Sequence, residues 1–169
     1  MVFPFLPCSS TCVTGQTGSG KTRFVFQLLK TVNDMYVEDP PNEILYCFSI
    51  HQPLFEEMEK IIPNITFHQG LPSPEVIDEF MAERRHRLIV FDDLMHRVVQ
   101  NVDMELLFTQ GCHHHRLSVV FITQNIFSRG TKSRTIALNT TYLVMMKNVK
   151  DVSQVATLGN NSFPDAPRY

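Results

Sequence analysis

The chain has 169 residues, 43% of them hydrophobic and 19% charged, which predicts a single domain that buries its own core without disulfides or a structural metal. Fifteen basic residues against 17 acidic ones give a formal net charge of −2, so the overall charge does not indicate a nucleic-acid binder. The N-terminus does not resemble a signal peptide, no apolar run is long enough to cross a membrane, and the four cysteines are scattered. We therefore expect a reduced, soluble, intracellular protein with no membrane contact.

Patterns typical of buried strands alternate with helical patterns along the chain. A short segment that contains Thr, Cys and Val and leads into Gly15 is expected to be a strand at 8–13, and apolar runs predict strands at 43–50, 88–91, 117–123 and 142–146. Helical periodicity and helix-start signals predict helices at 21–33, 54–62, 75–85, 102–110 and 151–158. Strands separated by helices favour βαβ units, so the predicted fold class is α/β, with a mainly parallel central sheet. We expect one domain over residues 1–169, with its core at about 9–158.

A glycine-rich segment lies between the first predicted strand and the first predicted helix, and it matches the phosphate-binding pattern G-x-x-x-x-G-K-[ST]. Its glycines let the backbone wrap around phosphate oxygens, and the N–H groups at the helix start face the anion. Lys21 is expected to reach the β- and γ-phosphates, and Thr22 to bind Mg²⁺. The residues expected to bind a nucleoside triphosphate are Gly15, Gln16, Thr17, Gly18, Ser19, Gly20, Lys21 and Thr22.

Two acids follow the buried run 88–91. In open α/β sheets, ligands bind beyond the carboxyl ends of the strands, which is where Asp92 and Asp93 fall. We expect Asp92 to hold Mg²⁺ opposite Thr22. Asp93 points elsewhere, either as a general base that polarises an attacking water or as a cap of the following turn.

Gln124 ends the predicted strand 117–123. If this strand lies between the first strand and the strand of Asp92, Gln124 arrives beside the γ-phosphate, where its amide can sense phosphate or orient water. Arginines flank the same strand. One of them could act as an arginine finger that completes the site of a neighbouring subunit, and Arg116 is the first candidate and Arg129 the second. The alternative for each is an ordinary solvated arginine on the surface.

Two basic clusters remain. The run 84–87 is expected to be a solvated helix terminus, at the sheet edge opposite the nucleotide. The polar loop at 129–134 is the better candidate for touching DNA in the pore of a ring.

Several longer segments resemble one family. They are 111–130, 133–139, Tyr142-Leu-Val, Tyr46-Cys-Phe-Ser with His51-Gln-Pro-Leu-Phe-Glu-Glu-Met58, and Phe91-Asp-Asp-Leu-Met95. These are similar to the genome-packaging ATPases of Polinton (Maverick) elements, adintoviruses and related large DNA viruses, in the FtsK–HerA superfamily. The resemblance extends from about Thr11 to Leu158, and the Thr-Gln-Asn block that ends at Asn125 is more specific than a phosphate-binding loop alone.

The resemblance implies a three-layer P-loop NTPase core of the RecA-like (ASCE) type that uses ATP and Mg²⁺. It implies a homo-oligomeric ring that pumps double-stranded DNA into a capsid, with a capsid or portal protein as a further partner. The Walker A lysine maps onto Lys21, the Mg²⁺ ligands onto Thr22 and Asp92, and the sensor glutamine onto Gln124. The superfamily usually has Glu where this chain has Asp93, and the segment 160–169 does not resemble the family's further strand, as in a truncated copy. The location implied is the host nucleus or cytoplasm, or the virion.

Two other functions fit parts of the pattern. A non-catalytic, nucleotide-binding assembly factor from a captured viral gene would explain the unusual C-terminal segment. A small P-loop kinase would explain the length, although a kinase needs an arginine-rich lid over its acceptor. The intact set of Lys21, Thr22, Asp92, Asp93 and Gln124 argues against the non-catalytic factor. The strand that ends in Gln124 suits a hydrolase better than a kinase.

Overall fold

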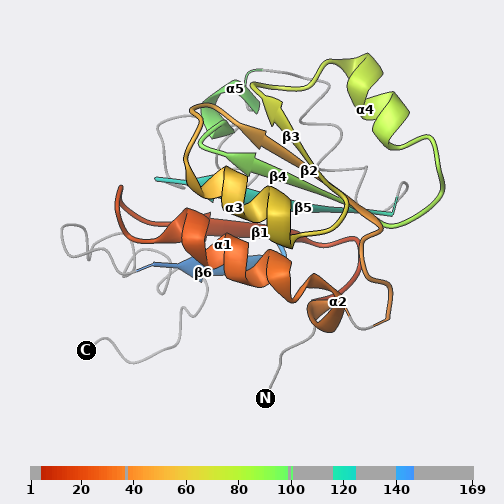
Figure 1. The fold of residues 1–169 in the computed structure, drawn as a ribbon, viewed down its shortest axis with the longest axis horizontal. Coiled ribbons are helices and arrows are strands. Elements are labelled where there is room, and N and C mark those ends of the chain that lie inside the picture. The colour runs from red at the N-terminus through yellow and green to blue at the C-terminus, as the bar shows by residue number, and fades with distance from the viewer. Residues whose placement is uncertain (1–4, 37, 99, 101–115, 125–139, 147–169) are drawn as a thin grey trace, which may run out of the picture.

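A computed structural model describes residues 5–36, 38–98, 100, 116–124 and 140–146. Six strands form one parallel sheet in the order β3-β2-β4-β5-β1-β6 (Figure 1). The strands are β1 (Ser10–Thr14), β2 (Glu43–Phe48), β3 (Ile65–Gln69), β4 (Arg87–Asp92), β5 (Leu117–Thr123) and β6 (Tyr142–Met145). The helices are α1 (Lys21–Lys30), α2 (Val32–Met35), α3 (Leu54–Ile61), α4 (Pro74–Phe80) and α5 (Met95–Val98).

The predicted α/β class with a parallel sheet is confirmed. All five predicted strands are present within a few residues of the expected bounds. The sheet also contains β3, which the sequence did not reveal because this edge strand is only partly buried and has no continuous apolar run. The short α5 was not predicted either. The predicted helices at 102–110 and 151–158 lie outside the described residues.

Two predicted helices are shorter than expected. The helix predicted at 21–33 ends at Lys30, and Thr31 separates it from the single turn of α2. The helix predicted at 75–85 becomes α4, which has a proline in its first turn and ends at Phe80. Both corrections concern helix ends, where an apolar periodicity can run on into a following turn.

The two faces of the sheet bury two separate hydrophobic clusters. Successive strand residues alternate between them: Cys12 and Phe91 belong to one cluster, whereas Val13 and Val90 belong to the other. Helices α1 and α3 cover the second face with Leu29, Met58 and their neighbours, and α4 and α5 contribute to the first. The described elements therefore form three layers, as expected.

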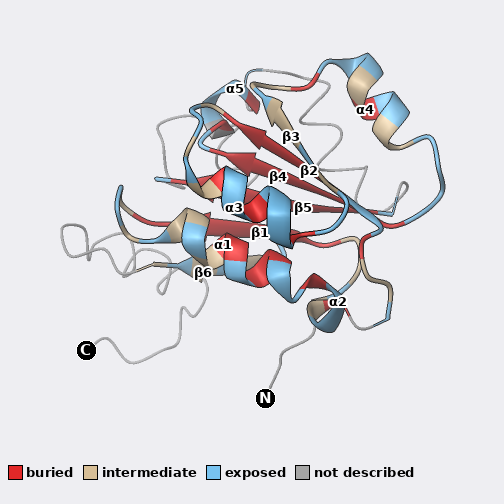
Figure 2. Cartoon of the chain, viewed as in Figure 1, coloured by how far each residue is buried: buried red, intermediate tan, exposed pale blue. Residues whose placement is uncertain are grey.

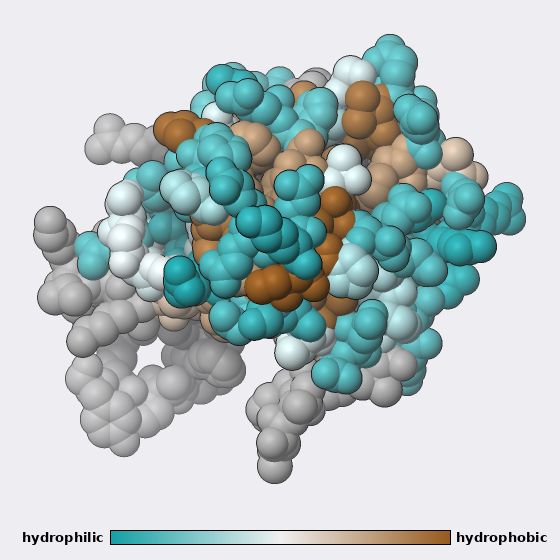
Figure 3. Space-filling model, in the orientation of Figure 1, coloured by the Kyte–Doolittle hydropathy of each residue, from teal (hydrophilic) through white to brown (hydrophobic). Residues whose placement is uncertain are grey.

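Burial follows this layered arrangement. Figure 2 shows the central strands buried, while the outward sides of α1 and α3 are exposed. In the same view, Figure 3 shows hydrophilic residues over these two helices, with apolar surface between them. Within the described ranges, no helix is both long and apolar enough to span a lipid bilayer.

The strand order fixes the position of the functional residues. β5 lies between β4 and β1, which is the condition set above for bringing Gln124 to the phosphate-binding loop. Because all the strand pairs are parallel, the carboxyl ends of β1, β2, β4 and β5 meet along one rim of the sheet. The loops that follow these four strands therefore converge.

Candidate functional site

The glycine-rich loop joins β1 to α1, in the strand–loop–helix context that its pattern requires. Gly20 is the N-cap of α1 and has φ 89°, a left-handed conformation that glycine adopts without a steric penalty. Gly15 is needed for a different reason. A Cβ there would lie 2.8 Å from Cβ of Met146 and 2.9 Å from Oγ of Ser19, so the loop passes too close to its neighbours for a side chain.

Lys21 extends its side chain along this loop. Its ammonium donates hydrogen bonds to the carbonyl oxygens of Gly15, at 2.7 Å, and Gln16, at 2.9 Å. Partial burial lowers the pKa of Lys21, and the nearby carboxylates of Asp92 and Asp93 act in the opposite direction. A positive charge is thus held at the mouth of a loop whose helix start already favours anions.

Asp92, at the end of β4, is 5% exposed and accepts two hydrogen bonds on the same oxygen. The Thr22 hydroxyl donates to Oδ2 at 3.2 Å, and the Tyr46 hydroxyl donates to Oδ2 at 2.8 Å. Burial raises the pKa of Asp92, and these two hydrogen bonds counteract the effect. The structure therefore brings together Thr22 and Asp92, the two residues expected to bind Mg²⁺, and adds a partner on β2 that sequence reasoning missed.

Asp93 leaves the line of β4 at once. It has φ 57°, an unusual conformation that aspartate tolerates better than most residues, and its N–H donates to the carbonyl of Ile122 at 3.0 Å. The Gln124 amide donates to Oδ2 of Asp93 across 3.5 Å, a long contact at the limit of a hydrogen bond. Both side chains are exposed at the rim, so the structure brings Asp93 and Gln124 together.

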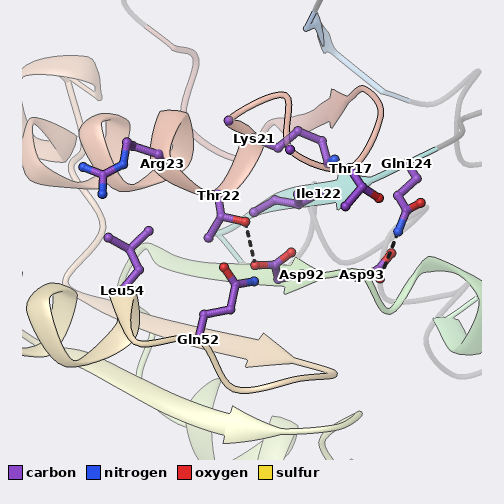
Figure 4. A pocket seen from close by; sticks show the side chains of 12 residues that line it. Thr17, Lys21, Thr22, Arg23, Gln52, Leu54, Asp92, Asp93, Ile122 and Gln124 are labelled. Carbon is purple, nitrogen blue, oxygen red and sulfur yellow. Dashed lines mark hydrogen bonds between the residues drawn. The ribbon is translucent and has the colours of Figure 1, made fainter. Parts of the chain in front are cut away.

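These groups border one pocket of about 530 Å³, within the size range of small-molecule sites (Figure 4). Its lining residues are Thr17, Gly18, Gly20, Lys21, Thr22, Arg23, Gln52, Leu54, Asp92, Asp93, Ile122 and Gln124. Figure 4 shows Gln52 reaching from the segment between β2 and α3 toward Asp92. Gln52 was not predicted, although a polar residue just past a buried strand is the same signal that identified Gln124.

Arg116 lies at the opposite rim. It directly precedes β5, whose carboxyl end carries Gln124, and its guanidinium pairs with Oδ2 of Asp39 at 2.7 Å. The fold therefore does not bring Arg116 to the pocket of its own chain, because Arg116 lies at the amino ends of the parallel strands and the pocket lies at their carboxyl ends. The role of Arg116 as an arginine finger for a neighbouring subunit stays a prediction. The second candidate, Arg129, lies outside the described residues.

The basic run 84–87 differs from the solvated helix terminus that we expected. α4 ends at Phe80, and the last two residues of the run, His86 and Arg87, are buried at 0% and 3% exposure. Arg87 begins β4 and pairs with Glu43 of β2 at 2.6 Å and with Glu83 at 3.3 Å. The expectation of solvation was wrong for these two residues because the run enters the sheet.

Comparisons with known proteins support the fold. No protein-family model matches the chain, and no curated protein matches its sequence. Among solved structures, the chain is similar to the cytoplasmic domain of EssC, with a TM-score of 0.64 and 12% identity. The match covers 95% of this chain and 36% of that one, so the chain spans about a third of the length of the protein it matches. The chain therefore shares the fold of the EssC cytoplasmic domain, a three-layer arrangement around a parallel sheet.

Proposed function

We propose that the chain binds ATP with Mg²⁺ in the pocket at the carboxyl rim and hydrolyses it. One observation carries this proposal: the phosphate-binding loop, the Thr22–Asp92 pair and the Asp93–Gln124 pair all border the same pocket. A phosphate-binding loop alone binds nucleotide. The two additional pairs supply the cation ligands and the polar groups beside a reacting phosphate that hydrolysis needs.

The residues present fit a magnesium ion. Thr22 Oγ1 and Asp92 Oδ2 are hard oxygen ligands 3.2 Å apart, close enough to share one cation. Across the described residues, no group of three His, Cys, Asp or Glu side chains could hold a metal by itself. This agrees with the usual magnesium site, in which one or two protein ligands act together with substrate phosphates. When bound, the ion would neutralise charge on the phosphate oxygens.

Asp93 and Gln124 are the groups that we assign to the attacking water. A carboxylate can accept a proton from that water, and an amide can hold its oxygen in line with the γ-phosphorus. Lys21 would bind the phosphate oxygens by exchanging its present carbonyl partners for them. Asp93 is one methylene shorter than the usual glutamate, and its left-handed backbone conformation sets the direction in which its side chain leaves the end of β4.

We further propose that the hydrolysis drives a ring of these chains along double-stranded DNA during genome packaging into a capsid. The support for this finer proposal is the sequence resemblance, which continues beyond the phosphate-binding loop through β2, β4 and β5. The fold shared with the cytoplasmic domain of EssC and the position of β5 between β4 and β1 are further support. Double-stranded DNA and a capsid or portal protein are the partners that this function requires.

The test is steady-state ATP hydrolysis by the full chain, with and without double-stranded DNA. We expect DNA to stimulate turnover, Lys21→Ala to abolish nucleotide binding, and Asp93→Asn to keep binding while turnover falls by about 100-fold or more. The matched control is Asp78→Asn, the same change at an exposed site on α4, which should behave like the native chain.

Each alternative has its own signature in this assay. Turnover that ignores DNA, with transfer of phosphate to a small acceptor, would identify a kinase. Nucleotide binding without turnover would identify a non-catalytic assembly factor. If the native chain failed to bind ATP at all, the assignment of the pocket itself would be overturned.

A further inference from the structure

Tyr46 is a buried group that the proposed mechanism does not yet use. It lies on β2, next to β4, and its register partner is Val90, two residues before Asp92. Residues two apart on a strand share a face, so Tyr46 and Asp92 lie on the face covered by α1 and α3. The ring is fully buried, and its hydroxyl donates to Oδ2 of Asp92 at 2.8 Å.

Packing fixes the position of this hydroxyl. The Tyr46 ring contacts Phe55 of α3 and Phe67 of β3, with centroids 5.2 Å and 5.3 Å away, and these two rings stack on each other. A ring held between a helix and a neighbouring strand has little freedom to rotate its hydroxyl away. The donor therefore stays in place and the carboxylate is oriented by it.

The hydrogen bonds that Asp92 accepts show how Tyr46 can orient its carboxylate. Tyr46 and Thr22 donate to the same oxygen, Oδ2, so neither of them uses Oδ1. In Figure 4, the oxygen of Asp92 that faces Thr22 is distinct from the second oxygen, which is turned away from Thr22. Two donors on one oxygen fix the plane of the carboxylate, so Oδ2 is held beside Thr22 Oγ1, where the two oxygens can share one cation.

We propose that Tyr46 is a positioning residue that holds Asp92 in the orientation in which it binds the nucleotide-associated Mg²⁺. The proposal rests on the proposed function, because it concerns the same cation. Tyr46 is not among the residues that line the pocket. It acts through Asp92, and the aromatic cluster of Tyr46, Phe55 and Phe67 links that carboxylate to α3 and β3.

The test is Tyr46→Phe, which removes one oxygen and keeps the ring. The melting temperature is measured first without ligand, and then with ADP while Mg²⁺ is titrated. We expect the Mg²⁺ concentration needed for half of the ADP-dependent rise to increase about tenfold, because a hydrogen bond to a charged group is lost. In hydrolysis assays, the same shift should appear in the Mg²⁺ dependence, and saturating Mg²⁺ should restore most of kcat.

Two further variants separate positioning from general stability. Tyr142→Phe is the matched control, because the Tyr142 hydroxyl accepts a hydrogen bond from the Leu6 N–H and does not contact Asp92. It should leave the Mg²⁺ dependence unchanged. Phe67→Leu keeps the Tyr46 hydroxyl but loosens its packing, so it should shift the Mg²⁺ dependence in the same direction by a smaller factor. It also provides a test if Tyr46→Phe does not fold.

The outcomes distinguish this inference from the proposed function. If Tyr46→Phe and Phe67→Leu lower the melting temperature without ligand but keep the native Mg²⁺ dependence, Tyr46 is merely structural and the inference is wrong. If the native chain shows no Mg²⁺-dependent response to ADP or ATP, the proposed function fails, and the inference fails with it.

Discussion

Gly15 occupies a point where the phosphate-binding loop meets β6. The N–H of Met146 donates to the carbonyl of Thr14 at 2.8 Å, which places the Met146 side chain against the first glycine of the loop. The glycine is therefore required by its neighbours as well as by phosphate. The sequence pattern indicated the residue but not Met146, which comes from more than 120 residues further along the chain.

Gly15→Ala should lower the free energy of unfolding by about 1–3 kcal/mol and weaken ATP binding, because the new Cβ forces Met146 or the loop to move. The measurements are urea unfolding and ATP titration. In a double-mutant cycle, Gly15→Ala combined with Met146→Gly should lose less stability than the two single changes summed. Simple additivity would show that the contact with Met146 does not limit the site.

The residues of the site divide into those that a local pattern reveals and those that the topology brings in. Lys21 and Thr22 belong to one contiguous motif, and Asp92 and Gln124 follow buried strands, so all four could be predicted. Tyr46 could not, because it sits inside a strand and reads as an ordinary core aromatic. Its role depends on β2 lying beside β4, which no local pattern specifies.

The start of β4 likewise could not be predicted from the local sequence pattern. Arg84, Arg85, His86 and Arg87 look alike as a basic run, yet the first two are exposed and the last two are buried. The difference arises because α4 ends early and Glu43, on the neighbouring strand, pairs with Arg87. Where a helix ends and a strand begins thus depends on tertiary partners that the local sequence does not specify.

Arg87→Ala should lower the free energy of unfolding by about 2 kcal/mol, because the variant loses the contact of the buried guanidinium with the Phe80 ring as well as two ion pairs. Arg85→Ala, two residues earlier, removes a side chain that is 65% exposed and should cost less than about 1 kcal/mol. Chemical denaturation of both variants checks the difference. Equal losses would contradict the assignment of Arg87 to the buried start of β4.

At the scale of the whole molecule, the parallel sheet separates two polar rims. The carboxyl rim carries the pocket, and the amino rim carries a hydrogen-bonded cluster around His86. His86 Nδ1 donates to the carbonyl oxygen of Asp39, so in the neutral ring Nε2 accepts from the Ser118 hydroxyl at 2.7 Å. The rings of Tyr36 and His86 also meet edge to face in this cluster. The ion pair between Asp39 and Arg116 is its last member. It ties the segment before β2 to the starts of β4 and β5.

Folding stability should fall at acid pH because of this cluster. Burial lowers the pKa of His86 below its usual value of 6.5, so the unfolded chain takes up a proton at a higher pH than the folded chain. Stability is therefore lost as the pH falls through 6.5 and is regained above it. Urea unfolding at about pH 5.5 and about pH 7.5 measures the difference, which His86→Gln should reduce. His96→Gln, at an exposed site on α5, is the control and should leave the difference unchanged.

The length of β4 has a practical consequence. Its six residues separate the two rims by about 20 Å, and the exposed connection at 82–85 ends two residues before Arg87, where the strand begins. A fluorophore or a surface tether attached at this connection would stand clear of the loop that holds phosphate. Single-molecule recordings could then follow the protein at work from a handle that leaves its chemistry untouched.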